Sequence, residues 1–201
     1  IVGSERNSRH QYSLIQKVAY KATGFIVDLV IANSREGALF NSRELNVDFS
    51  KFRVIHNGVD VERFFPKNKI EMKRELGLKR DEFVIGMFSS FKKQKNHKFL
   101  LKAIKNLLNE YRNIKLLLVG GYLTDNVEGS KTYFEEVQEL VQKLDLAKEC
   151  IFLGNRNNVE DLYSACDVTV LPSYYEGTPN VLLESMACAV PVIASNVSDN
   201  K

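Results

Sequence analysis

Two carboxylates flank an expected helix start within the stretch Val168–Ser195, VTVLPSYYEGTPNVLLESMACAVPVIAS. The apolar run VTVLPS predicts a strand, and the turn after it predicts a helix with Thr178 as N-cap and Pro179 in the first helical position. Glu176 then precedes this helix and Glu184 lies within it. The free N–H groups and the positive dipole end of a helix start favour a phosphate or polar ligand. The two carboxylates could then accept hydrogen bonds from its hydroxyl groups.

A second stretch with suitable chemistry lies between an earlier strand and its helix. Residues 89–97, SSFKKQKNH, carry Lys92, Lys93 and Lys95. Lysines at such a position can stabilise the charge of a phosphate, including charge that develops as a bond breaks. Plainer interpretations stay open, because the lysines could form a solvated charged run, and the two glutamates a helix cap and a surface carboxylate.

The elements that must position these residues alternate between strand and helix, which predicts parallel sheets with crossover helices. In the first part of the chain we expect strands and helices at Ile1–Gly3, Tyr12–Lys21, Leu29–Ala32, Arg35–Leu45 and Phe52–His56. Three short strands and two helices would leave one edge and one face of a sheet unpaired. We therefore expect this part to be the end of a domain whose beginning lies outside the sequence.

The alternation restarts near Ile70 and is clearer there. Before the stretch that begins at Val168, strands and helices are expected at Val84–Phe88, His97–Tyr111, Ile114–Gly120, Tyr133–Leu146, Ile151–Gly154 and Val159–Ala165. Five strands separated by four helices predict a doubly wound α/β sheet, in which ligands bind at the carboxyl ends of the strands. The intervening segment Asn57–Lys69 is typical of an interdomain connection, and Phe64 and Phe65 are its expected anchors.

Composition and charge indicate a globular protein and give no sign of a nucleic-acid partner. The 201 residues are 44% hydrophobic, enough for a substantial core, and the net charge of +3 comes from dispersed Lys and Arg, which does not indicate a nucleic-acid partner. The three cysteines, Cys150, Cys166 and Cys188, lack metal-ligand spacing and predict buried thiols in a reducing compartment. We therefore expect a cytoplasmic protein.

Four motifs together resemble the retaining glycosyltransferases of family four, the glycosyl transferases group 1. Glu176 and Glu184 match the family pattern of Glu, seven residues, Glu. VIHNGVDVERFFP resembles the interdomain segment, FKKQKNH the phosphate-binding loop, and IFLGNRNNVEDLYSACDVTVLPS the nucleotide-base pocket. The resemblance implies a GT-B fold of two Rossmann-like domains. Residues 1–62 would be the end of the N-terminal, acceptor-side domain with the hinge, and residues 63–201 the donor-binding domain without its last elements.

The resemblance also implies roles for individual residues. Glu184 would bind the ribose hydroxyls. Lys95 would bind the diphosphate and Glu176 the donor sugar, and Lys95 and Glu176 are therefore the candidate catalytic residues. The further candidates for donor binding are Ser90, Lys92, Arg156, Asn157, Gly177, Thr178, Pro179 and Asn180. Arg156 and Asn157 would lie beside the base, and the N–H groups from Gly177 to Asn180 would reach the sugar and diphosphate.

Two positions depart from the family pattern. Where many members have Arg in the phosphate loop, a plain alignment places Ser90, while an alternative family form aligns Lys92, which we favour. Lysine supplies a point charge in place of a bidentate fork, so diphosphate binding would be weaker or differently angled. Ala189 stands where the family usually has Gly; a left-handed backbone there would cost about 1–2 kcal/mol, unless the helix end is reshaped.

The implied reaction is retaining, metal-independent transfer of a sugar from a nucleotide diphosphate sugar, with UDP or GDP expected, to the hydroxyl of a glycan or lipid-linked acceptor. No cofactor and no metal are expected, in keeping with the lack of an Asp-x-Asp motif. Peripheral association with the inner face of the membrane stays open. The alternatives are a nucleotide-sugar binding module without turnover, which the 201 residues would be on their own, and a GT-B nucleotide-sugar epimerase.

Overall fold

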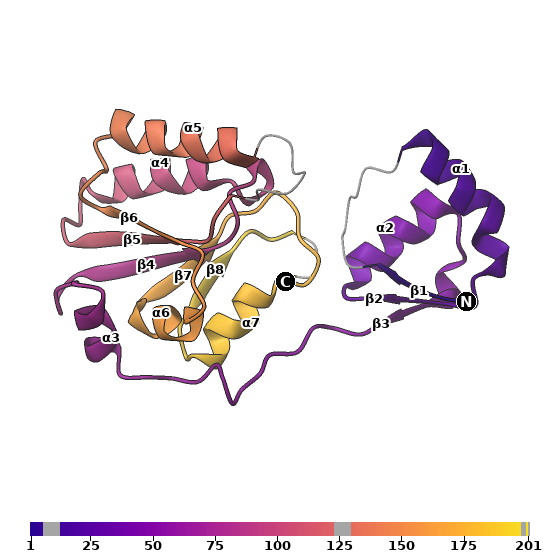
Figure 1. Ribbon diagram of the computed structural model, residues 1–201, viewed down its shortest axis with the longest axis horizontal. Coiled ribbons are helices and arrows are strands. Elements are labelled where there is room, and N and C mark those ends of the chain that lie inside the picture. Colours follow the sequence, from indigo (N-terminus) through magenta and orange to yellow (C-terminus); the bar gives the residue numbers. More distant parts are fainter. Residues whose placement is uncertain (6–12, 123–129, 198–199, 201) are drawn as a thin grey trace. The chain divides into compact units, whose positions relative to one another are not determined.

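The computed structural model describes residues 1–5, 13–122, 130–197 and 200. Its contacts divide the chain into two compact units. The smaller unit comprises Ile1–Gly58, Tyr175–Asn180 and Asn196–Lys201, and the larger unit comprises Val59–Tyr174 and Val181–Ser195. Both contain a parallel sheet with helices, which confirms the expected α/β class (Figure 1). The expected division at residues 62 and 63 stays a prediction.

The smaller unit is built on a three-stranded parallel sheet in the order β1-β2-β3. Its elements are β1 (Val2–Glu5), α1 (Leu14–Thr23), β2 (Leu29–Ala32), α2 (Arg35–Leu45) and β3 (Phe52–Val54), with 3-10 turns at Gly24–Ile26 and Phe49–Lys51. Tyr12, the expected start of α1, lies outside the described residues. Ser13 caps α1 in a capping box with Gln16. No residue of α1 is buried.

The larger unit contains five parallel strands in the order β6-β5-β4-β7-β8. The strands are β4 (Phe83–Phe88), β5 (Ile114–Val119), β6 (Cys150–Gly154), β7 (Val168–Leu171) and β8 (Val192–Ala194). The helices are α3 (Lys69–Glu75), α4 (His97–Leu107), α5 (Ser130–Lys143), α6 (Val159–Ala165) and α7 (Asn180–Ala187). The chain leaves β4 toward β5 and β6, then returns to place β7 on the other side of β4. Strand order therefore reverses between β4 and β7, as in doubly wound sheets.

The sheet of the larger unit has an apolar layer on each face. Figure 1 shows α4 and α5 on one face and α6 and α7 on the other. Ile85 and Met87 of β4 belong to the core beneath α4 and α5, whereas Val84 and Phe88 belong to the core on the opposite face. This alternation follows from the two-residue period of a strand. Because both faces are covered, β4 is a continuous apolar run in the sequence, and so is β5 from Leu116 onward.

Three sequence-based expectations about this unit are decided by packing. Phe64 is 7% exposed and belongs to the core on the α6 and α7 face, so it anchors the connection as expected. Phe65 is 46% exposed, and the prediction that it is also an anchor is wrong. The three cysteines are free and buried, as predicted.

The start of α7 also corrects the sequence interpretation. The helix begins at Asn180, so Thr178 is not its N-cap and Pro179 is not in its first helical position. The Thr178 hydroxyl instead donates a 2.5 Å hydrogen bond to the carbonyl oxygen of Asn33, within the smaller unit. This partner lies 145 residues away in the sequence, so a local pattern could not reveal it.

Candidate functional site

A pocket of about 370 Å³ lies at the carboxyl ends of the central strands of the larger unit. Its floor follows the ends of β4 and β5, and its walls come from the residues after β6 and from α6 and α7. The lining residues are Phe88, Ser89, Ser90, Val119, Gly120, Asn155, Arg156, Val159, Tyr163, Val181 and Glu184. It lies at the carboxyl edge of the sheet beside the reversal of strand order, where doubly wound sheets bind ligands.

Backbone hydrogen bonds fix the floor of this pocket. The Ser89 N–H donates to the Val119 carbonyl oxygen at 2.9 Å, and the Gly120 N–H donates to the Gly154 carbonyl oxygen at 2.9 Å. The ends of β4, β5 and β6 are therefore held together. A Cβ on Gly121 would lie 2.8 Å from the end of the Asn155 side chain, so that side chain would have to shift to admit it.

Ser89 also contacts a buried histidine at the start of α4. His97 Nε2 lies 3.2 Å from Ser89 Oγ, and the imidazole is 1% exposed and stacked on Phe91 at 4.4 Å. Burial, with a smaller contribution from the charge of Lys95, lowers the pKa of His97 to about 3. The ring is therefore neutral at physiological pH. Within the described residues, its Nδ1 atom has no hydrogen-bond partner.

Glu184 lies half-buried on α7 and faces the same pocket. One carboxylate oxygen, Oε2, accepts a 2.8 Å hydrogen bond from the hydroxyl of Tyr163 on α6. Glu184, Ser90 and Arg156 are thus three predicted donor-binding residues that the fold brings to one pocket. Arg156 is exposed, and Asn157, which follows it, does not line the pocket. The backbone oxygen of Asn157 accepts a hydrogen bond from Arg63 at 2.9 Å.

The lysine-bearing loop meets the strand exit after β7. Lys93–Lys95 form a 3-10 turn, and the N–H of Tyr174 donates to the carbonyl oxygen of Gln94 at 2.9 Å. Within the larger unit, the lysine-bearing turn therefore lies beside Tyr174, at the end of the segment that follows β7. Lys92 and Lys95 are partly exposed, and neither is among the residues that line the pocket.

The predicted residues between β7 and α7 belong by their contacts to the smaller unit. Glu176 is 7% exposed. Asn57 Nδ2 donates to the Thr178 carbonyl oxygen at 2.8 Å and to Asn180 Oδ1 at 2.7 Å. None of the five residues Glu176, Gly177, Thr178, Pro179 and Asn180 lines the pocket of the larger unit.

Several lining residues were not predicted from the sequence. Three of them, Ser89, Gly120 and Asn155, each directly follow a strand that an apolar run identifies. Their positions at strand ends could therefore have been predicted from the sequence. Tyr163 lies within the stretch that resembles the nucleotide-base pocket, but no pattern singled out this residue. It lies in a short helix, and only the return of the chain from β6 to β7 brings it over the end of β4.

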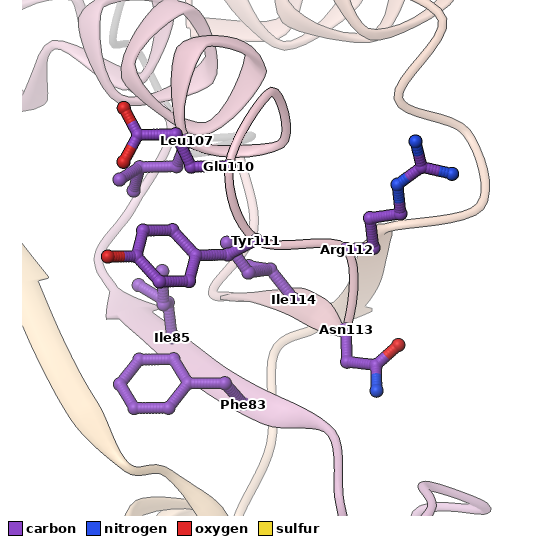
Figure 2. A pocket seen from close by; sticks show the side chains of 8 residues that line it. All are labelled: Phe83, Ile85, Leu107, Glu110, Tyr111, Arg112, Asn113 and Ile114. Atoms are coloured by element: carbon purple, nitrogen blue, oxygen red, sulfur yellow. The ribbon is translucent and has the colours of Figure 1, made fainter.

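A larger hollow of about 560 Å³ lies at the opposite edge of the same sheet. It is lined by Phe83, Ile85, Leu107, Glu110, Tyr111, Arg112, Asn113 and Ile114. Figure 2 shows the rings of Phe83 and Tyr111 beside Ile85, with Arg112 and Asn113 pointing away from them. Since Phe83 and Ile114 begin β4 and β5, this hollow lies at the amino ends of the strands. Doubly wound sheets bind ligands at the other edge, so the pocket beside Glu184 is the candidate site.

The family model for glycosyl transferases group 1 matches residues 68–201. The chain belongs to the glycosyl transferases group 1 family. This match contains the whole larger-unit sheet and every residue that lines the candidate pocket. The family expected from the four sequence motifs is therefore confirmed.

Two curated relatives illustrate what the chain is similar to. The chain is 36% identical over 163 residues to an Escherichia coli UDP-Gal:alpha-D-GlcNAc-diphosphoundecaprenol alpha-1,3-galactosyltransferase, covering 79% of this chain and 40% of the relative. It is 32% identical over 171 residues to an N-acetyl-alpha-D-glucosaminyl L-malate synthase of Bacillus anthracis, covering 85% of this chain and 42% of the relative. The chain thus spans less than half the length of these two relatives.

Solved structures agree in fold. Anabaena HepE, crystallised with UDP and glucose, superposes with a TM-score of 0.86 at 26% identity, covering 98% of this chain and 52% of HepE. Sucrose-phosphate synthase from Thermosynechococcus elongatus superposes with a TM-score of 0.79 at 29% identity, covering 93% of this chain and 45% of that protein. The expected GT-B glycosyltransferase architecture is confirmed by these likenesses. Among the helices of the described residues, none has the length and apolar character needed to cross a bilayer.

Proposed function

We propose that this chain is the nucleotide-binding part of a retaining glycosyltransferase, which transfers a sugar from a nucleotide diphosphate sugar to an acceptor hydroxyl. The observation that carries the proposal is the pocket at the carboxyl ends of β4 and β5, where Ser90, Arg156 and Glu184 come together. A carboxylate, an arginine and a hydroxyl at the edge of a doubly wound sheet suit a nucleotide. The complex of HepE with UDP and glucose supports the same ligand class.

In the proposed complex, Glu184 accepts hydrogen bonds from the ribose hydroxyls, and Arg156 and Asn157 lie beside the base. Lys95 and Lys92 neutralise the diphosphate, while Glu176 and the N–H groups from Gly177 to Asn180 contact the sugar and diphosphate. As the bond between the anomeric carbon and the diphosphate breaks, negative charge develops on the departing diphosphate. Positive charge already in position lowers the energy of that transition state.

We propose that this charge is met by lysine and backbone N–H groups, with no metal and no cofactor. The support is the position of Lys92 and Lys95 in a loop hydrogen-bonded through Gln94 to the exit of β7. Transfer by the whole protein is expected to persist in excess EDTA. Transfer that requires an added divalent metal would contradict this part of the proposal.

For the acceptor, we propose a glycan or a lipid-linked glycan. The support is the name of the E. coli relative, which specifies a sugar on diphosphoundecaprenol as its acceptor. An acceptor of that kind lies at a membrane, so we extend the proposal to a cytoplasmic protein in peripheral contact with the inner face. Sedimentation with vesicles that carry a diphospholipid acceptor, compared with vesicles of the bulk lipid alone, tests this extension.

Calorimetric titration of the chain with UDP, GDP and ADP tests the nucleotide site. We expect binding of UDP or GDP to weaken at least about tenfold in Glu184→Ala and in Lys95→Ala, because each loses a charged hydrogen-bonding group. Glu110→Ala and Lys102→Ala are matched controls, since Glu110 lines the hollow at the opposite edge and Lys102 is exposed on α4. If neither Glu184→Ala nor Lys95→Ala changes the affinity for nucleotide, the assignment of this nucleotide site is wrong.

The same titration addresses a second function for the chain taken by itself, nucleotide binding without turnover. The observation in its favour is that the lining of the pocket comes entirely from the larger unit. A longer chain that extends to the length of the relatives should transfer sugar, whereas the 201 residues should bind nucleotide only. Sugar transfer or donor hydrolysis by the 201 residues would contradict this division.

A further inference from the structure

The contact between Tyr163 and Glu184 joins two helices across the wall of the candidate pocket. Tyr163 belongs to α6 and Glu184 to α7, and the phenol hydroxyl donates to Glu184 Oε2 at 2.8 Å. Both residues line the pocket. A hydrogen bond from a neutral donor to a carboxylate is among the stronger side-chain bonds, so it restricts the carboxylate to few orientations.

Tyr163 is held rigidly in place. Its side chain is 1% exposed, and its ring stacks on Phe88 with centroids 3.8 Å apart and planes 22° apart. Phe64 meets the same ring edge-on at 6.1 Å. Packing on two sides restricts the ring, since close-packed interiors leave little room for other rotamers. The position of the hydroxyl is therefore set by the core and not by the ligand.

Tyr163 acts only as a donor toward Glu184. Burial, followed by the neighbouring charge of Glu184, raises the pKa of Tyr163 above its ordinary value. The phenol thus keeps its proton at any physiological pH, and the carboxylate accepts. Within the described residues, the other carboxylate oxygen, Oε1, has no hydrogen-bond partner from the protein.

We propose that Tyr163 is a positioning residue, which holds Glu184 by Oε2 so that Oε1 is presented to the ribose hydroxyls of the donor nucleotide. The proposal rests on the proposed function, because it assigns the ribose to Glu184. Without the phenol hydroxyl, the Glu184 side chain would rotate among several conformers. Binding would then have to restore one of them, at a cost in conformational entropy.

A purely structural role makes a different prediction. If the hydrogen bond served only to join α6 to α7, its loss would lower stability and weaken every ligand of the pocket alike. If it positions Glu184, its loss would weaken only ligands that carry ribose hydroxyls. A pair of nucleotides that differ in these hydroxyls alone therefore separates the two roles.

The test uses UDP and 2′,3′-dideoxy-UDP, titrated against the wild-type chain and Tyr163→Phe, which keeps the ring and removes the hydroxyl. We expect Tyr163→Phe to weaken UDP binding by about two- to tenfold, the range of one hydrogen bond, and to leave dideoxy-UDP binding unchanged. Tyr133→Phe is the matched control, because Tyr133 is also buried in the larger unit but does not line the pocket. It should change neither affinity.

The outcomes distinguish this inference from the proposed function. If wild type prefers UDP to dideoxy-UDP and Tyr163→Phe keeps the full preference, or weakens both nucleotides equally, the positioning role is overturned. If wild type shows no preference and Glu184→Ala changes nothing, the assignment of the ribose to Glu184 fails instead. A crystal structure of Tyr163→Phe gives a test that needs no ligand, because an unchanged Glu184 carboxylate would itself overturn the inference.

Discussion

The backbone of Gly120 lies against that of Ser89 so closely that a Cβ on Gly120 would be 2.2 Å from the Ser89 carbonyl oxygen. Gly120 also has a φ of +132°, which residues with a side chain rarely adopt. These two residues follow the central strands β4 and β5 directly and form the floor of the candidate pocket. Only glycine permits this approach.

Gly120→Ala is expected to lower the free energy of unfolding by about 3 kcal/mol and to abolish nucleotide binding, because the clash is with backbone and cannot be relieved by a side chain. Gly154→Ala is the control that separates the cost of a positive φ from the cost of a steric clash. Gly154 also has a positive φ, +64°, but a Cβ there meets nothing within 4 Å. It should cost about 1 kcal/mol. Urea denaturation measures the free energy of unfolding of both variants. Equal losses of stability in the two would contradict a steric clash at Gly120.

Ala189 adopts the left-handed backbone that its place after α7 demands, with a φ of +56°. Its N–H donates to the Met186 carbonyl oxygen and the Val190 N–H to the Ser185 carbonyl oxygen, each at 3.0 Å, which is the Schellman pattern. Ala189→Gly should therefore stabilise the chain by about 1 kcal/mol. Ala187→Gly, inside the helix, should destabilise it by a similar amount. A thermal melt in which both variants shift the same way would refute this.

His97 makes the stability of the larger unit depend on pH. Its pKa is about 3 in the folded chain and near 6.5 when unfolded, so the unfolded chain binds the extra proton between these values. Stability should fall as pH drops below about 6.5, with a slope approaching about 1.4 kcal/mol per pH unit from this residue. His97→Gln should flatten the slope between pH 6 and 4. His56→Gln, at an exposed position, should not, and equal slopes in all three proteins would contradict the assignment.

Asp167 ties α3 to the sheet. Its carboxylate accepts from Lys73 Nζ and from the Val84 N–H, each at 2.8 Å, and from Lys69 Nζ at 3.0 Å. Burial acts to raise the pKa of Asp167, but the hydrogen bonds from Lys73, Val84 and Lys69 outweigh it and lower the pKa below 3.8. The ionised form thus contributes stability above about pH 4, and this contribution is lost as pH falls through the lowered pKa.

Asp167→Asn is expected to lower the free energy of unfolding by about 3 kcal/mol at pH 7, because Lys73 has a side chain only 6% exposed and would remain charged without its partner. The control is Glu136→Gln, which breaks the more exposed pair with Lys98 and should have little effect. Denaturant unfolding at pH 7 and pH 3 measures the difference. A loss that is as large at pH 3 as at pH 7 would show that the charge is not the cause.

The sequence specified most elements because their signals are local. The bounds of α2, Arg35–Leu45, and of α6, Val159–Ala165, were predicted without error, since the local sequence pattern marks them. Helix α3 was missed, because its seven residues are mostly charged and offer no apolar face to read. Helix α4 ends at Leu107 and not at Tyr111, since the apolar spacing continues into a turn.

The stretch that carries Glu176 and Glu184 shows where the sequence stops being sufficient. Its motif was enough to indicate the family, the sheet type and a carboxylate facing the candidate pocket. It could not show that Thr178 bonds to Asn33 or that Tyr163 holds Glu184, because these partners are 145 and 21 residues away. Periodicity reports which face of an element is apolar, whereas the contents of a pocket depend on strand order and packing. Only the tertiary structure decides those.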